Sequence, residues 1–119
     1  MHSLTLNDPW FNLVKEGIKL YEGRCYWKSV LDFKIDDQVL VSHHTDISKP
    51  SFICNIKTIL HFTTFKEALE KLGLDSTLPG VKTIDEGVDI YLKFVSLATQ
   101  IKFGVVMIEL IPSGIRFAD

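Results

Sequence analysis

The spacing of hydrophobic positions changes several times along this chain, and each change predicts a new element. Residues 3–7 (SLTLN) predict a short first strand. Residues 7–17 (NDPWFNLVKEG) instead have helical spacing, which places Trp10, Leu13 and Val14 on one face. The chain therefore begins with a strand that is followed by a short amphipathic helix.

The ends of this first helix carry their own signals. Asp8 suits the N-cap, and Pro9 suits the first helical position. Gly17 suits the left-handed position that ends a helix. Residues 20–27 are rich in tyrosine and tryptophan, which favour strands. We therefore predict that the helix ends at Gly17 and that a second strand follows.

The middle of the chain predicts a turn and two further strands. Asp36 and Asp37 are typical turn residues, and the hydrophobic stretch that follows them predicts a strand that ends near residue 44. Residues 51–62 (SFICNIKTILHF) are rich in β-branched and aromatic residues. This composition predicts a long central strand.

Two helices and a last strand complete the pattern. Residues 63–73 and 83–95 each begin with a capping box, in which a threonine is followed three residues later by a glutamate. We expect an irregular loop between the two helices, and a last strand at residues 104–111 that is apolar enough to be buried on both faces. The apolar face of the second helix consists of Ile84, Val88, Tyr91, Leu92 and Val95.

The order of these elements limits the fold class. Strands and helices do not alternate regularly, so a doubly wound parallel sheet is not expected. A small mixed β-barrel with helices packed on its outside, of the α+β class, fits the order better. A length of 119 residues suits one domain, and we predict a single domain over residues 1–119.

Composition and charge narrow the possible functions. The formal net charge is −2, which argues against a protein held to nucleic acid by bulk positive charge and leaves room only for a local basic patch. No apolar run approaches the roughly 18 residues that a membrane span needs, and the first residues lack the pattern of a signal peptide. We expect a protein of the cytoplasm, or of the nucleus in a eukaryote, with no membrane partner.

The most unusual cluster of charges lies at residues 17–24. On a strand, Glu22 and Arg24 project from the same face, and Gly23 between them leaves room for close approach on the other. Lys19 lies in the turn before them, within reach of the same place. Arginine suits bidentate binding of phosphate or carboxylate. A plain ion pair on the surface of the sheet is the alternative interpretation.

The stretch GIKLYEGR, residues 17–24, resembles the G-x-K-x-x-E-x-R signature of ASCH domains, which belong to the PUA-like superfamily. Residues 6–19 and 21–41, the segment at 78–94 that contains the later helix, and the last strand also resemble the corresponding segments of that family. The resemblance implies a PUA-like β-barrel, with the signature lining a cleft beside the first helix. It also implies binding of RNA, or of a nucleotide or nucleoside.

Carried over by position, the resemblance assigns ligand binding to Gly17, Lys19, Glu22 and Arg24. Trp10, on the preceding helix, is either a wall of the cleft on which a base stacks or a plain core aromatic. Four further lysines either border a patch that follows phosphates or form an ordinary solvated face. These lysines are Lys28, Lys34, Lys49 and Lys57.

Some proteins that carry this domain are small amidohydrolases that act on an acylated cytidine, and ribonuclease activity is ascribed to others. In the amidohydrolases a threonine nucleophile stands where this chain has Glu22. The enzyme hypothesis makes Lys19 the base and Glu22 the acid–base or orienting group. The binding hypothesis uses the same cleft for recognition alone, and a protein-interaction domain that keeps only the fold is the third possibility.

Other chemistry has weaker signals. His43 and His44 are adjacent on a strand and face opposite ways, so we expect no metal site, although one of them could face the cleft. Cys25 and Cys54 are expected to be reduced and buried. No phosphate-binding glycine loop is present, so no cofactor is expected. Of the oligomeric states, we favour a monomer.

Overall fold

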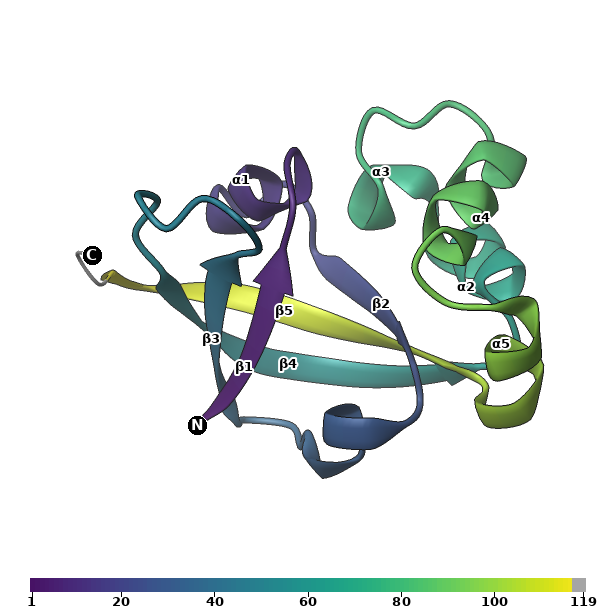
Figure 1. Ribbon diagram of the computed structural model, residues 1–119, viewed down its shortest axis with the longest axis horizontal. Helices are drawn as coiled ribbons and strands as arrows, with labels where there is room; N and C mark the ends of the chain where they lie inside the picture. The colour runs from purple at the N-terminus through teal and green to yellow at the C-terminus, as the bar shows by residue number, and fades with distance from the viewer. Residues whose placement is uncertain (117–119) are drawn as a thin grey trace.

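The computed structural model describes residues 1–116 and contains one five-stranded mixed sheet (Figure 1). Residues 117–119, the end of the predicted domain, lie outside the described part. The strand order is β1-β3-β4-β5-β2, in which β1 is parallel to β3 and the other pairs are antiparallel. The strands are β1 (His2–Leu6), β2 (Tyr21–Cys25), β3 (Gln38–His43), β4 (Phe52–Phe62) and β5 (Val105–Arg116).

The sheet is curled into a half-barrel, and β1 and β2 form its two edges. The long strands β4 and β5 pair in its middle, with register shifts between Phe52 and Cys54 and between Ile56 and Thr58. Such irregularities bend a sheet and increase its twist. The predicted small barrel of the α+β class, with helices packed on its outside, is confirmed, with the barrel open between β1 and β2.

The last strand is buried on both of its faces, as its apolar composition predicts. Val106, Ile108 and Leu110 belong to the core inside the half-barrel. Val105 and Met107 belong to a second core on the outside, against the helices. The strand starts at Val105 and runs to Arg116, further than the sequence predicted, because it stays paired with β4 as far as Phe52.

Most of the helices pack on the outside of the sheet, at the end where β2 lies, whereas α1 lies apart from them against β1 and β3 (Figure 1). Both predicted capping boxes are present: the hydroxyls of Thr64 and Thr83 accept from the backbone N–H of Glu67 and Glu86. The helices are α1 (Trp10–Lys15), α2 (Phe65–Leu72), α3 (Leu74–Thr77), α4 (Ile84–Leu92) and α5 (Leu97–Phe103), and a 3₁₀ helix spans Lys28–Asp32.

The predicted start of the first helix was wrong. Pro9, and not Asp8, is the N-cap of α1, the helix begins at Trp10, and no side chain caps it. Asp8 instead forms an ion pair across the surface with Lys49, at 3.0 Å, and lies 3.3 Å from His43 Nε2. The carboxylate is held by these long-range partners, so it does not turn back to the helix.

Helix α5 and the short α3 were not predicted from the sequence. The polarity of α5 is reversed: Leu97 and Ile101 are exposed, and Gln100 is buried. The Gln100 side-chain oxygen accepts from the backbone N–H of Phe65 at 2.8 Å, which satisfies a donor at the start of α2. A helix that buries a glutamine lacks the apolar stripe by which amphipathic helices are recognised. None of the helices in residues 1–116 is long and apolar enough to cross a membrane.

Candidate functional site

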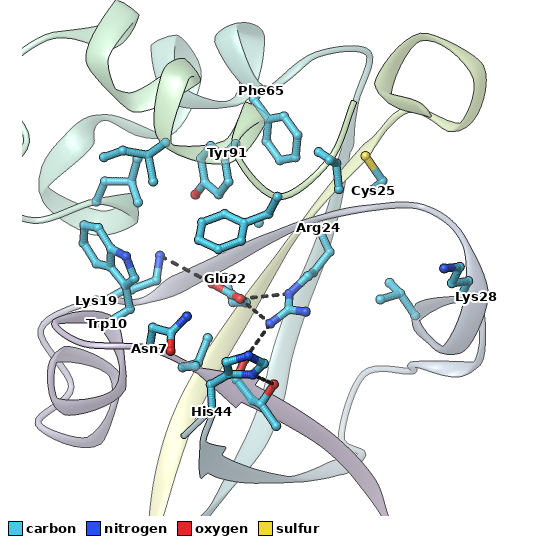
Figure 2. Close-up of a pocket in the computed structure, with 18 of the residues that line it drawn as sticks. Asn7, Trp10, Lys19, Glu22, Arg24, Cys25, Lys28, His44, Phe65 and Tyr91 are labelled. Atoms are coloured by element: carbon cyan, nitrogen blue, oxygen red, sulfur yellow. Dashed lines mark hydrogen bonds and ion pairs between the residues drawn. The ribbon is translucent and has the colours of Figure 1, made fainter. Parts of the chain in front are cut away.

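A pocket of about 400 Å³ lies at the open side of the half-barrel, between the edge strands and the helices (Figure 2). This volume is in the range of small-ligand sites. Its lining includes the turn before β2, β2 itself, the end of β1, and residues of α1 and α4. Four of the five predicted ligand-binding residues line it, namely Trp10, Lys19, Glu22 and Arg24.

Lys19 lies at the base of this pocket and is almost completely buried, with 1% of the side chain exposed. Its ammonium donates to the backbone oxygen of Tyr21 at 2.7 Å and to that of Thr77. The Glu22 carboxylate lies 3.7 Å away, and the ring centroid of Trp10 lies 5.5 Å away. The Lys19 ammonium is therefore held in one position, although the long side chain would allow it to move if it were exposed.

Glu22 joins this buried lysine to a more exposed arginine. One carboxylate oxygen faces Lys19, and the other accepts from Arg24 Nε at 2.9 Å and lies 2.7 Å from Arg24 Nη2. Arg24 Nη2 also donates to the backbone oxygen of Thr5 at 3.1 Å. Because Thr5 belongs to β1, the guanidinium bridges the two edges of the half-barrel.

Burial changes the acid–base chemistry of the base of the pocket. Desolvation lowers the pKa of Lys19 to about 8, and the neighbouring Glu22 carboxylate opposes this shift. The side chain is therefore still mainly an ammonium at pH 7. The ion pair that the sequence allowed is present, but it belongs to a cation–anion–cation row that lines a pocket, in which Lys19 and Glu22 are buried and Arg24 is partly exposed.

Gly17, the fifth predicted residue, does not line the pocket. It lies at φ +77° after α1, and this left-handed turn allows the N–H groups of Ile18 and Lys19 to donate to the backbone oxygen of Leu13. A Cβ at this position would meet nothing within 4 Å. The role of Gly17 is thus to turn the backbone and direct Lys19 inward.

Replacing Gly17 by alanine is expected to lower the free energy of unfolding by about 1 kcal/mol, because alanine is strained at this positive φ. Urea denaturation measures the change. Gly17→Asn is the matched control, since asparagine tolerates the left-handed region better and should cost less. An equal cost for both variants would contradict a role that depends on φ alone.

Aromatic side chains form much of the remaining wall. Trp10, Trp27 and Phe94 line the pocket, and the lysine beside Trp27, Lys28, has its ammonium 4.2 Å from that ring centroid. Trp10 lines the pocket and also packs, partly buried, against the second core cluster, so it has features of both interpretations. Flat apolar walls with few polar groups suit a planar ligand.

The structure separates the other predicted candidates. Of the four scattered lysines, Lys28 lines the pocket, whereas Lys34, Lys49 and Lys57 do not. His44 also lines the pocket, and its Nδ1 lies 3.3 Å from the hydroxyl of Thr5.

The adjacent His43 turns the other way and packs edge-on against Phe11. In residues 1–116, no group of three or more His, Cys, Asp and Glu side chains is placed to hold a metal. Cys25 and Cys54 are both buried, and burial raises the pKa of the Cys25 thiol.

One pocket residue whose side chain could bind a ligand was given no role in the site by the sequence analysis. Tyr91 of α4 appeared there only as part of an apolar helix face, yet its hydroxyl lies in the pocket wall beside Gly23. A tyrosine among the apolar positions of an amphipathic helix was the available signal. The cleared space opposite Gly23 is therefore occupied by this ring and by Met107.

Comparison with known proteins agrees with this fold. The ASCH domain profile matches residues 4–113. The crystal structure of the hypothetical protein PH0355 is 34% identical, with a TM-score of 0.82 over 92% of this chain and 96% of its own. The solution structure of PF0455 from Pyrococcus furiosus is 32% identical, with a TM-score of 0.76 over 96% and 98%.

A more distant neighbour shares the fold alone. A mutant form of the ZmASCH protein of Zymomonas mobilis is 10% identical, with a TM-score of 0.62 over 92% of this chain and 68% of its own. A search of curated proteins found no match. Because the domain profile covers nearly the whole chain and two structures above 30% identity cover it as well, the chain belongs to the ASCH domain family.

Proposed function

We propose that this protein binds single-stranded RNA, or a nucleotide derived from it, in the pocket lined by Lys19, Glu22 and Arg24. The observation that carries the proposal is the convergence of these three charges with aromatic walls on one open pocket. ASCH domains are generally thought to bind RNA, and the membership of this chain supports the same role.

The contacts of Lys19 favour recognition over base catalysis. A general base must release its proton and accept another from the substrate. The Lys19 ammonium already donates to the backbone oxygens of Tyr21 and Thr77, and it faces Glu22. All three neighbours stabilise the protonated form. Hydrolysis in this pocket would be detected by mass spectrometry after incubation with acylated nucleosides or RNA.

Replacing Arg24 by alanine is expected to weaken binding of a fluorescent single-stranded RNA by about tenfold at low salt, since one charge-assisted contact is lost. Fluorescence anisotropy measures the affinity, after thermal melts have shown that the variant is folded. Arg24→Lys keeps the charge but loses the bidentate guanidinium, so its affinity for RNA should lie between those of the wild type and Arg24→Ala.

Lys66→Ala is the matched control, because it removes an exposed positive charge of α2 that does not line the pocket. Its affinity should stay close to that of the wild type. The proposal fails if the wild type binds no RNA at low salt, or if Arg24→Ala and Lys66→Ala bind RNA equally well.

A further inference from the structure

The hydroxyl of Tyr91 is a buried donor without a partner. The Tyr91 side chain is 8% exposed, and its oxygen makes no hydrogen bond within the part of the chain that the structure describes. Leaving a buried hydroxyl unsatisfied costs roughly 1–3 kcal/mol. A phenylalanine would fill the same place without that cost, so the hydroxyl is free to bind a ligand atom that residues 1–116 do not supply.

The ring cannot turn to find a partner elsewhere. One face of it stacks on Phe65, with the centroids 4.2 Å apart and the planes 8° from parallel. Gly23 of β2 is so close that a Cβ there would lie 2.9 Å from the Tyr91 hydroxyl. Figure 2 shows the hydroxyl pointing away from the helices, toward the side of the pocket that holds Lys19 and Glu22. The donor is fixed and directed into the pocket.

The Tyr91 hydroxyl remains a donor across the physiological range. Burial and the nearby Glu22 carboxylate both raise the pKa of Tyr91, so the phenol keeps its proton. The pocket therefore offers a ligand one hydrogen-bond donor and one hydrogen-bond acceptor. Tyr91 offers a proton, and the Glu22 carboxylate accepts one.

We propose that the pocket holds a nucleobase by its polar edge: the Tyr91 hydroxyl donates to a carbonyl or ring-nitrogen acceptor, and Glu22 accepts from the adjacent N–H. This inference rests on the proposed function and names the part of the nucleotide that enters. Nucleobases present a donor beside an acceptor along one edge, and their flat faces suit walls such as Trp10 and Trp27.

A phosphate does not suit the same place. The Glu22 carboxylate lines the pocket and would repel a dianion, and both nearby cations already face that carboxylate. The Lys19 ammonium is further occupied by two backbone oxygens. The phosphate and ribose accordingly stay at the mouth, where Lys28 is exposed.

The test compares Tyr91→Phe with the wild type by isothermal titration calorimetry. The probes are the four ribonucleoside 5′-monophosphates and ribose 5-phosphate, which lacks a base. Tyr91→Phe should weaken the tightest nucleotide by about tenfold, because the acceptor of the base loses its partner. Binding of ribose 5-phosphate should be weak and unchanged. Tyr26→Phe, which removes an exposed hydroxyl outside the pocket lining, is the matched control and should bind as the wild type does.

Stability provides an independent readout. Since the hydroxyl has no hydrogen-bond partner among residues 1–116, the midpoint of urea unfolding of Tyr91→Phe should equal or exceed that of the wild type. A variant that loses affinity and stability together would overturn the inference, because the hydroxyl would then serve the fold.

The remaining outcomes separate the two proposals. If the wild type binds RNA or nucleotides and Tyr91→Phe binds them equally well, the role of Tyr91 is overturned and the proposed function stands. An equal loss for nucleotides and ribose 5-phosphate would likewise overturn the assignment to the base. If the wild type binds neither RNA nor any nucleotide, both proposals fail.

Discussion

Replacing Glu22 by glutamine is expected to lower the free energy of unfolding by about 2 kcal/mol at pH 6, since the buried Lys19 ammonium loses its only anionic neighbour among the contacts described for it. Glutamine keeps the size and shape of the side chain, so packing in the pocket should be preserved. The expected loss of stability therefore comes from the loss of the negative charge of the carboxylate. Urea denaturation of the two proteins at pH 6 measures it.

The deficit should depend on pH in a defined direction. The pKa of Lys19 in the folded wild type is about 8, below the ordinary 10.5, so the unfolded chain binds more protons between these values and stability rises with pH across that window. Without Glu22, which raises this pKa, the lower edge of the window moves below pH 8. The deficit is therefore largest below about pH 7 and shrinks near pH 9, where Lys19 is mainly neutral in both folded proteins.

A second variant isolates the lysine as the cause. In the double variant Lys19→Met with Glu22→Gln, no ammonium is buried, so it should be more stable at pH 6 than Glu22→Gln alone. The double variant should also lack the rise in stability that Lys19 contributes above pH 8. A deficit below 1 kcal/mol, or one equal at pH 6 and pH 9, would show that Glu22 does not compensate the buried charge.

Local rules predicted the fold well where they act on few residues. The threonine caps at Thr64 and Thr83 and the left-handed Gly17 are decided within one helical turn, and all three are present. The burial of β5 on both faces also followed from its own composition. These local signals can be recognised without knowing which segments of the chain are in contact in the folded protein.

The errors have a tertiary origin. The Asp8 carboxylate pairs with Lys49 and lies close to His43, which approach from β3 and the loop after it, so a cap that local rules predict does not form. Helix α5 buries Gln100 because the start of α2 needs an acceptor there. Neither partner is visible from the neighbouring sequence.

In the candidate site as well, some features follow from the local sequence and others depend on tertiary contacts. The spacing placed Glu22 and Arg24 on one face and Lys19 within reach, and the three side chains do meet. The burial of Lys19 depends on α3, because the Thr77 backbone oxygen accepts a hydrogen bond from the Lys19 ammonium across 58 residues of sequence. The position of Tyr91 opposite Gly23 likewise depends on how α4 packs against β2.

The other large effect is expected at Gly23, where alanine should lower the free energy of unfolding by about 2 kcal/mol. A Cβ there would lie 2.9 Å from Met107 Sδ and from the Cε1 and hydroxyl oxygen of Tyr91. Met107 is fully buried, and the Tyr91 ring is stacked on Phe65, so the neighbours have little room to move. The cost is steric, because this glycine has no positive φ that alanine would strain.

The same substitution should weaken nucleotide binding by more than tenfold, as it displaces the Tyr91 hydroxyl and the strand that carries Glu22 and Arg24. Calorimetry and urea denaturation measure the two effects on one sample. Gly73→Ala is the matched control: it strains a positive φ in open space outside the pocket lining, so it should lose stability and keep affinity. If both alanine variants lose stability and both keep full affinity, then the close contact between β2 and Tyr91 serves the core alone, and the ligand does not depend on it.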